Sequence, residues 1–300
     1  MRLFIIGNGF DLYHGLKTSF ADYHRFLIEN YPKTLESIQC SKYFDGCGID
    51  IFDEHNVFWT DVERHLKFNY DLMLEETVDE YYPPNLLEKS DARWHRVEFD
   101  ADEKAKKIDN SFTNEALIQW MKSIDVLMCN QTKKFSFGSE DYFVSFNYTE
   151  TLEDVYGVES TRILHIHGCI SNPKSLQFGN PDQTSRIIRE KFEMDYGDKD
   201  FYEMTIKPAE EKYLIIADSM SKDLDENIPI LRSFLKNKIF ENVTIMGHSF
   251  MGVDKPYYDK VLIPMYSKLD WTIFAHGDDA VKNAETFFAR YGINGTAIKW

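Results

Sequence analysis

The sequence predicts an α/β fold with a mostly parallel sheet, and three patterns support this prediction. Short apolar runs of four or five residues recur along the chain, and polar or glycine-containing turns follow several of them. These runs alternate with segments of helical periodicity, which is typical of parallel strands joined by crossover helices. The first run, Leu3–Ile6, leads directly into the turn Gly7-Asn8-Gly9. A strand followed by a glycine-rich turn and a helix opens many nucleotide-binding α/β folds.

Composition excludes several classes of protein. The 300 residues carry a formal net charge of −16, which argues against a nucleic-acid-binding surface. No run of 18 apolar residues occurs and the N-terminus lacks a signal-peptide pattern, so we expect a cytoplasmic protein with no membrane partner. The four cysteines form no C-x-x-C pair, so we expect no zinc site and no other metal.

The chain is expected to form one sheet-based core with a helical insertion. Residues 1–31 and 136–300 supply the Rossmann-like nucleotide-binding core, whereas residues 32–135 carry helical patterns and a strongly charged stretch. The clearest amphipathic helix of this insertion is predicted by the apolar spacing of Leu117, Trp120, Met121, Ile124 and Met128.

Six further apolar runs are candidate strands of the same sheet. Tyr213–Ala217 stays open between strand and helix, because an aperiodic run of this length suits both. A helix over residues 254–268 is expected to begin with Asp254 as its N-cap and to kink at Pro264. The candidate strands are Tyr142–Phe146, Ile163–Ile166, Tyr213–Ala217, Val243–Met246, Trp271–Ala275 and Thr296–Trp300.

Four expected strands end in turns that carry polar side chains or glycine. The carboxyl ends of parallel strands share one edge of a sheet, and ligands bind there, so these turns are predicted to meet at one pocket. His165 and His167 alternate along a strand and should point to opposite faces; His167, at the strand's end, is the better candidate. The turns are Gly7-Asn8-Gly9, Asn147-Tyr148-Thr149, His167-Gly168 and Gly247-His248-Ser249.

Each of these residues also has an ordinary structural interpretation. Asn147 would then be a turn residue and His167 a buried histidine under a loop. Asp11 lies in the first turn of the expected helix, where a carboxylate would repel a bound phosphate. It therefore either contacts a ligand hydroxyl or caps the turn, and the sequence does not decide between these roles.

Five segments together resemble the AbiH family of phage abortive-infection proteins. They follow the family's order over roughly residues 3 to 292, and they read IIGNGFDLYHGLKTSF, FWTDVERHL, SFNYTETLE, HIHG and IMGHSFMGVDKPYY. The family is similar, more distantly, to the sirtuin-like fold. Sirtuin-like proteins have a glycine-rich first turn, an asparagine after a middle strand, a catalytic His-Gly turn and a Gly-Thr-Ser turn that holds the dinucleotide. A sirtuin deacylase also carries a four-cysteine zinc module, which this chain lacks.

This resemblance implies a defence protein that hydrolyses NAD⁺ to nicotinamide and ADP-ribose. His167 would act as the base on a ribose hydroxyl or a water, and Asn147 would hold that water or hydroxyl. The expected partners are NAD⁺ or a related nucleotide, a phage-derived trigger and further copies of the same chain. The residues expected to bind the dinucleotide are Gly7, Asn8, Gly9, Asp11, Gly168, Gly247, His248 and Ser249.

Two alternatives remain open on the sequence. The chain could bind a nucleotide or a phage component as a sensor without turnover. It could also be a serine hydrolase, because Gly247-His248-Ser249 resembles the start of a G-x-S-x-G nucleophile elbow, with His276 as its base. The second glycine of that motif stands one position late, at Gly252. A dehydrogenase is disfavoured, since no clear second strand carries an acid about 20 residues after the first turn.

Overall fold

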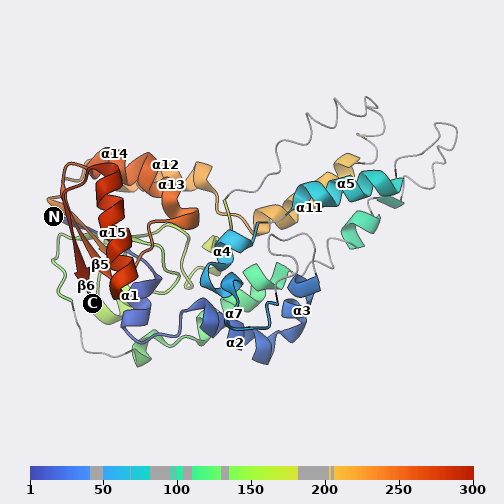
Figure 1. Ribbon diagram of the computed structural model, residues 1–300, viewed down its shortest axis with the longest axis horizontal. Helices are drawn as coiled ribbons and strands as arrows, with labels where there is room; N and C mark the ends of the chain where they lie inside the picture. Colours follow the sequence, from blue (N-terminus) through green and yellow to red (C-terminus); the bar gives the residue numbers. More distant parts are fainter. Residues whose placement is uncertain are drawn as a thin grey trace. The chain divides into compact units, whose positions relative to one another are not determined.

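The computed structural model describes residues 1–40, 50–67, 69–81, 96–97, 99–103, 110–129, 135–181, 203 and 206–300. Its contacts divide the chain into two compact units (Figure 1). Unit 1 comprises Met1–Tyr23, Ile118–Gln177 and Asp223–Trp300, and unit 2 comprises His24–Leu117 and Phe178–Lys222. All the predicted site residues belong to unit 1. Much of the charged stretch of the predicted insertion lies outside the described residues.

Unit 1 contains a sheet whose described strands all pair in parallel, in the order β3-β2-β1-β4-β5-β6. This is the strand order of dinucleotide-binding α/β folds, so the predicted α/β class with a Rossmann-like parallel sheet is confirmed. The order reverses between β1 and β4, where such sheets open a crevice for ligands. The strands are β1 (Arg2–Ile6), β2 (Tyr142–Ser145), β3 (Ile163–His165), β4 (Asn242–Met246), β5 (Asp270–Ala275) and β6 (Gly295–Lys299).

Alternate side chains of the strands enter two different cores, as the period of two requires. On β1, Leu3 and Ile5 join the larger core under α12 and α15, whereas Phe4 and Ile6 join the smaller core with Phe10 of α1. Figure 1 shows α15 lying along β5 and β6. The helical elements of unit 1 are α1 (Asn8–Tyr13), η3 (Val126–Met128), α8 (Thr151–Tyr156), η4 (Ser160–Arg162), η5 (Pro173–Ser175), α12 (Leu224–Leu235), η7 (Gly252–Asp254), α13 (Lys255–Tyr257), η8 (Tyr258–Leu262), α14 (Ile263–Tyr266) and α15 (Gly277–Tyr291).

Unit 2 is helical in its described part. Within it, α5 packs against α11, and Thr77 Oγ1 lies 3.0 Å from the hydroxyl of Tyr213. The boundary between the units falls within α2 (Phe20–Asn30) and α7 (Glu115–Ser123). The remaining elements of unit 2 are α3 (Pro32–Cys40), η1 (Val57–Thr60), α4 (Val62–His65), α5 (Tyr70–Tyr81), η2 (Asn110–Thr113) and α11 (Lys207–Ser219).

Two helix predictions were too long, and one open segment is now assigned. Tyr213–Ala217 is helical, because it lies inside α11, which starts with a proline in its first turn. The amphipathic helix ends at Ser123, and Met128 is 82% exposed on η3 instead of continuing the buried face.

The predicted helix over residues 254–268 is divided into several short elements, with a π-helical turn over Tyr258–Leu262. Pro264 has no N–H to donate to the carbonyl of Lys260, and Arg232 Nη2 donates to that carbonyl at 2.9 Å. A π turn is one way in which a helix accommodates such a break. Asp254 occupies the N-cap position of α13 and a proline stands in the first turn, as predicted, but the Asp254 side chain makes no capping hydrogen bond there.

The turns after β1 and β4 meet backbone to backbone at the reversal of the strand order. Gly9 N–H donates to Gly247 O at 2.8 Å, and a Cβ atom on Gly9 would lie 2.7 Å from Gly247 Cα. A Cβ atom on Gly7 would lie 2.6 Å from His248 Cα. Glycine is therefore required here by the contact between the two turns themselves.

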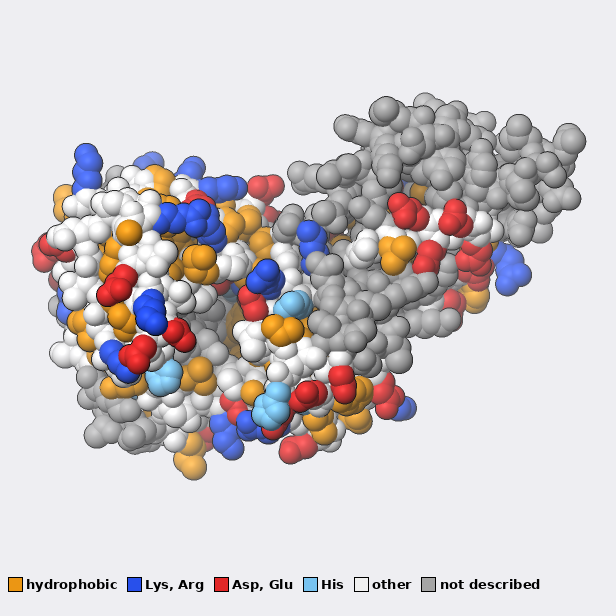
Figure 2. Space-filling view, in the orientation of Figure 1, with side chains coloured by type: hydrophobic (Ala, Val, Ile, Leu, Met, Phe, Trp, Pro, Cys, Tyr) orange, Lys and Arg blue, Asp and Glu red, His pale blue; other side chains and the backbone are white. Residues whose placement is uncertain are grey.

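No helix in the described residues is long and apolar enough to cross a membrane. On the face of unit 1 seen in Figure 2, acidic and basic side chains are interspersed. Lys299 Nζ, for example, lies 2.6 Å from Asp278 Oδ1.

Replacing Gly247 by alanine tests the contact between the turns. Gly247 has a φ of 67°, and a Cβ atom would fall on the backbone nitrogen of Phe10, so we expect Gly247→Ala to lower the free energy of unfolding by about 3–5 kcal/mol. Gly292 has a φ of 63° but open space around it, so Gly292→Ala should cost only about 1–2 kcal/mol. Urea denaturation followed by circular dichroism measures both; equal losses would show that the close approach carries no energy.

Candidate functional site

The site residues occupy the carboxyl edge of the sheet, in the turns after β1, β2, β3 and β4. The polar side chains of this edge form two clusters. The Asn147 cluster consists of Asp11, Asn147, Thr149 and Thr151, and it stands beside the turn that follows β1. The His167 cluster consists of His167, His248, Asp254 and Tyr257.

Asn147 directly follows the residue after β2 and is buried. Its Nδ2 donates to Gly7 O at 3.1 Å, which fixes the orientation of the amide because a carbonyl can only accept. Its Oδ1 is buried and has no hydrogen-bond partner among the described residues. An unsatisfied buried acceptor costs about 1–3 kcal/mol, so this oxygen is suited to a water or a ligand hydroxyl.

Asp11 is a buried acid on α1, and its two oxygens accept from the hydroxyls of Thr149 and Thr151. Burial raises the pKa of Asp11 to about 6, although the hydrogen bonds from Thr149, Thr151 and Asn147 oppose that shift. These contacts join the carboxyl group of α1 to the segment after β2, and contact with a ligand hydroxyl stays a prediction.

His165 and His167 contact different elements; β3 ends at His165, and His167 lies in the turn that follows it. His165 Nε2 lies 2.9 Å from Glu153 Oε1 on α8, and its Nδ1 lies 3.0 Å from the carbonyl of Asn147. Burial lowers the pKa of His165, but the hydrogen bond and charge of Glu153 outweigh it, so the pKa is raised overall. This histidine is thus engaged by acceptors at both ring nitrogens.

His167 lies near Asp254 and Tyr257, an acid and a tyrosine from the C-terminal half of the chain. Its Nε2 lies 3.1 Å from the hydroxyl of Tyr257 and 3.6 Å from Asp254 Oδ1. The side chain is 1% exposed. The ring of Phe146 lies edge-on to His167, with 5.4 Å between centroids, and closes the side of the cluster towards β2.

His248 shares the same acid. Its Nε2 lies 3.3 Å from Asp254 Oδ2, and its ring lies over Phe146 with 4.0 Å between centroids. Its Nδ1 receives the backbone N–H of Phe250 at 3.0 Å and lies 2.9 Å from the hydroxyl of Tyr258. Burial and then the charge of Asp254 raise the pKa of Tyr258 well above its ordinary value, so this phenol keeps its proton.

Three other predicted residues make different contacts. Asn8 is exposed, and its Nδ2 donates to Thr18 O at 2.8 Å. Gly168 has a φ of 80°, and a Cβ atom there would collide with the carbonyl of Ser175, so it allows the turn to pack on η5. Ser249 is exposed, and no hydrogen bond from a side chain to its hydroxyl is found among the described residues.

The sequence interpretation missed Asp254 and Tyr257 as members of the site. One signal was present, because residues three apart share a helical face, so both side chains could have been placed on the same side. Asp254 was instead assigned to a cap, which the local pattern also fits. In the described part of the chain, no group of three His, Cys, Asp or Glu side chains is arranged to hold a metal ion.

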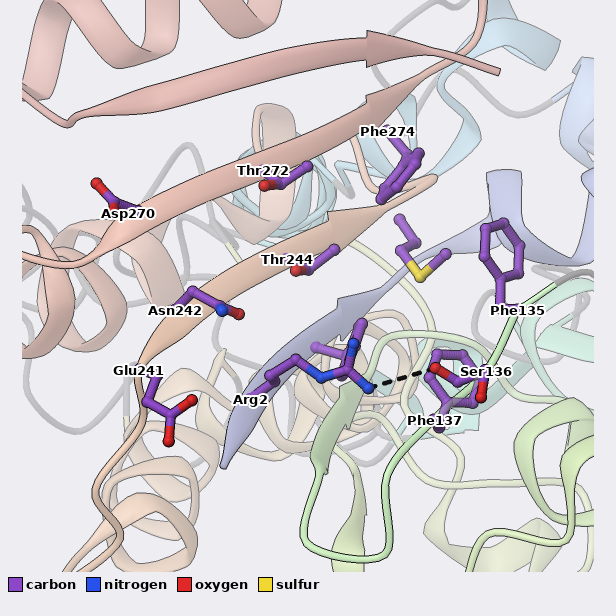
Figure 3. A pocket seen from close by; sticks show the side chains of 12 residues that line it. Arg2, Phe135, Ser136, Phe137, Glu241, Asn242, Thr244, Asp270, Thr272 and Phe274 are labelled. Atoms are coloured by element: carbon purple, nitrogen blue, oxygen red, sulfur yellow. Dashed lines mark hydrogen bonds between the residues drawn. The ribbon is translucent and has the colours of Figure 1, made fainter.

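A separate concavity of about 380 Å³ lies on the face of the sheet, away from these turns (Figure 3). Its floor includes Thr244 and Thr272, which are paired on β4 and β5, and Phe274 forms part of an aromatic end. Arg2 reaches across β1 and donates to Ser136 O at 3.3 Å. None of the sequence-predicted site residues lines this concavity.

The raised pKa of Asp11 predicts a pH dependence of stability. The folded-state pKa of about 6 lies above the ordinary aspartate pKa of 3.8, so the folded state holds this proton more tightly and loses stability as pH rises from about 4 to 6. Asp11→Asn removes this titration. We expect the difference in unfolding free energy between variant and wild type to shift in the variant's favour by about 2 kcal/mol between pH 4 and 7.5.

Urea denaturation at both pH values measures this difference, with the exposed Asp279→Asn as the matched control. A difference that does not change with pH would contradict a raised pKa at Asp11.

The sequence and the structure were compared with known protein families, curated proteins and solved structures. No curated protein and no solved structure matches it significantly. A family model described as bacteriophage abortive infection AbiH matches residues 3–275, which include every residue of both clusters. Because this match spans most of the sequence, the chain belongs to the AbiH family of bacteriophage abortive-infection proteins.

Proposed function

We propose that this defence protein hydrolyses NAD⁺ to nicotinamide and ADP-ribose at the carboxyl edge of the unit 1 sheet. The observation that carries the proposal is the buried Oδ1 of Asn147, which has no hydrogen-bond partner among the described residues and lies where the strand order reverses between β1 and β4. Sheets with this strand order bind dinucleotides at that crevice. The resemblance to sirtuin-like proteins, which place an asparagine and a His-Gly turn at such an edge, supports the same chemistry.

The reaction requires little from the protein beyond positioning and a base. The bond between ribose C1′ and the nicotinamide nitrogen breaks, and its electron pair neutralises the cationic ring, so the leaving group needs no acid. Water attacks C1′ of the oxocarbenium-like ribose and loses one proton. In the proposal Asn147 Oδ1 accepts a hydrogen bond from that water or from a ribose hydroxyl, and His167 takes the proton.

The two ring nitrogens of His167 are not equivalent in this role. Tyr257 and Asp254 both engage Nε2, so a substrate hydroxyl or water would approach Nδ1. A neutral imidazole with a proton on Nε2 presents a lone pair at Nδ1, which is the form that a general base needs. The turns containing Gly7, Gly9 and Gly247 would line the dinucleotide's path at the crevice.

Substitution of the two proposed residues tests the function. His167→Ala should lower kcat for NAD⁺ cleavage by about 10²–10⁴-fold, because the water loses its base. Asn147→Ala should lower it as well, since the water loses its acceptor. Chromatography of nicotinamide and ADP-ribose measures turnover, and His55→Ala, whose side chain is 85% exposed, serves as the matched histidine control.

Wild-type cleavage that persists in both variants would overturn the assignment. If the wild-type protein gives no products, calorimetric titration with NAD⁺ separates the remaining cases. Binding without turnover, with and without phage lysate, would favour the sensor alternative. The absence of binding under both conditions would exclude the dinucleotide.

A further inference from the structure

We propose that Asp254 is a positioning residue of this site, which holds His167 in the tautomer with its proton on Nε2. The inference rests on the proposed function, because it concerns the base of that reaction. The Asp254 carboxylate lies between the Nε2 atoms of two histidines from different strand ends.

The Asp254 carboxylate is largely buried, and each of its oxygens faces a different histidine. Asp254 Oδ2 lies 3.3 Å from His248 Nε2, and its other oxygen lies 3.6 Å from His167 Nε2. The side chains of His167, His248 and Asp254 are 1%, 4% and 13% exposed. At these exposures, water screens the carboxylate charge weakly, so the charge acts strongly on both rings.

His248 is fixed in one protonation state by its neighbours. The backbone N–H of Phe250 can only donate, and it points at Nδ1 of His248 from 3.0 Å, so this nitrogen must present a lone pair. Phe250 holds a φ of 41°, a strained value for a bulky residue, in making this contact. The single ring proton of His248 is therefore on Nε2, facing Asp254, and it stabilises the ionised carboxylate.

The second oxygen of Asp254 then acts on His167. A separation of 3.6 Å is too long for a hydrogen bond, so Asp254 acts as a charge, and the hydrogen-bond partner of Nε2 is the Tyr257 hydroxyl at 3.1 Å. A carboxylate favours a proton on the nitrogen that faces it. Asp254 therefore favours Nε2–H on His167, which is the tautomer whose Nδ1 carries the lone pair that the proposed reaction uses.

Tyr257 is itself fixed by an amide pair. Asn227 Nδ2 donates to the Tyr257 oxygen at 3.0 Å and to Gln177 Oε1 at 2.7 Å. Gln177 Oε1 also accepts the backbone N–H of Asp223 at 3.1 Å, which sets the orientation of both amides. The amide pair therefore keeps the phenol oxygen in place beside Nε2.

Three elements carry the ionisable groups whose contacts near His167 are resolved. In the described residues these are Asp254 of η7, Tyr257 of α13, and His248 of the turn after β4, which contacts the same carboxylate. His248 is neutral because its ring carries one proton, and Tyr257 is neutral when its hydroxyl keeps its proton. Asp254 is therefore the charged member of this set of contacts, and its substitution tests that charge.

The first measurement is the tautomer of His167 in the wild-type full chain. Nitrogen-15 histidine NMR reports the protonation of each ring nitrogen, and His167→Gln and His248→Gln identify the two signals by their loss. We expect Nε2–H and an unprotonated Nδ1 for both rings near pH 8. A proton on Nδ1 of His167 would overturn the proposal without any variant of Asp254.

The second measurement compares Asp254→Asn with the wild type in the NAD⁺ cleavage assay across pH. Loss of the charge should lower kcat about 100-fold with little change in KM, and should move the acid limb of the rate profile about one pH unit lower. Asp254→Glu restores the charge and should recover part of the rate. Asp279→Asn makes the same chemical change on the surface and should match the wild type.

The outcomes separate this inference from the proposed function. Cleavage that survives His167→Ala would refute the proposed function, while the tautomer measurement still decides the role of Asp254 on the ring. A rate and pH profile of Asp254→Asn equal to wild type, with His167 still essential, would refute the inference and leave the function standing. A lower rate with an unshifted acid limb would also refute it, since a purely structural role predicts that result.

Discussion

The site depends on the backbone contact between the turns after β1 and β4. The hydrogen bond from Gly9 N–H to Gly247 O fixes where both turns stand at the reversal of the strand order. The first turn then positions Asn147, which donates to the carbonyl of Gly7. The second turn continues into His248 and so positions Asp254 and, through it, His167. The positions of Asn147 and His167, which are separate in the sequence, therefore both depend on this one backbone contact.

The sheet was largely predictable because its strands are short, continuous apolar runs that end in recognisable turns. Their boundaries agree with the structure to within one residue at most ends, as for Asn242–Met246. Period-two alternation did not decide between His165 and His167, because β3 ends at His165 and His167 lies in the turn after it. The local pattern did not decide the structure of Tyr213–Ala217, because an aperiodic apolar run fits both a strand and the helix that forms there. It also did not predict how the helix divides into short elements near Pro264.

The candidate site was only partly predictable, because its members are joined by contacts that no local pattern records. The strand ends pointed to Asn147 and His167, yet the partners of Asp11 are threonines 138 and 140 residues away. Asp254 fits a helix cap by its position, whereas its carboxylate lies between two histidines from distant turns. Tertiary contacts of this kind override local preference, and they decide what a polar side chain does.

The glycine contact also separates the determinants of the fold from those of the chemistry. The turns meet through backbone atoms, so any residue with a Cβ atom at Gly7, Gly9 or Gly247 would collide with the opposite turn. The side chains of Asn147 and His167 project from a scaffold that these glycines have already fixed. Over evolution, descendants could exchange those side chains and lose or change activity while keeping the same folded frame. Lineages of this family would then diverge in their reaction before they diverge in their architecture.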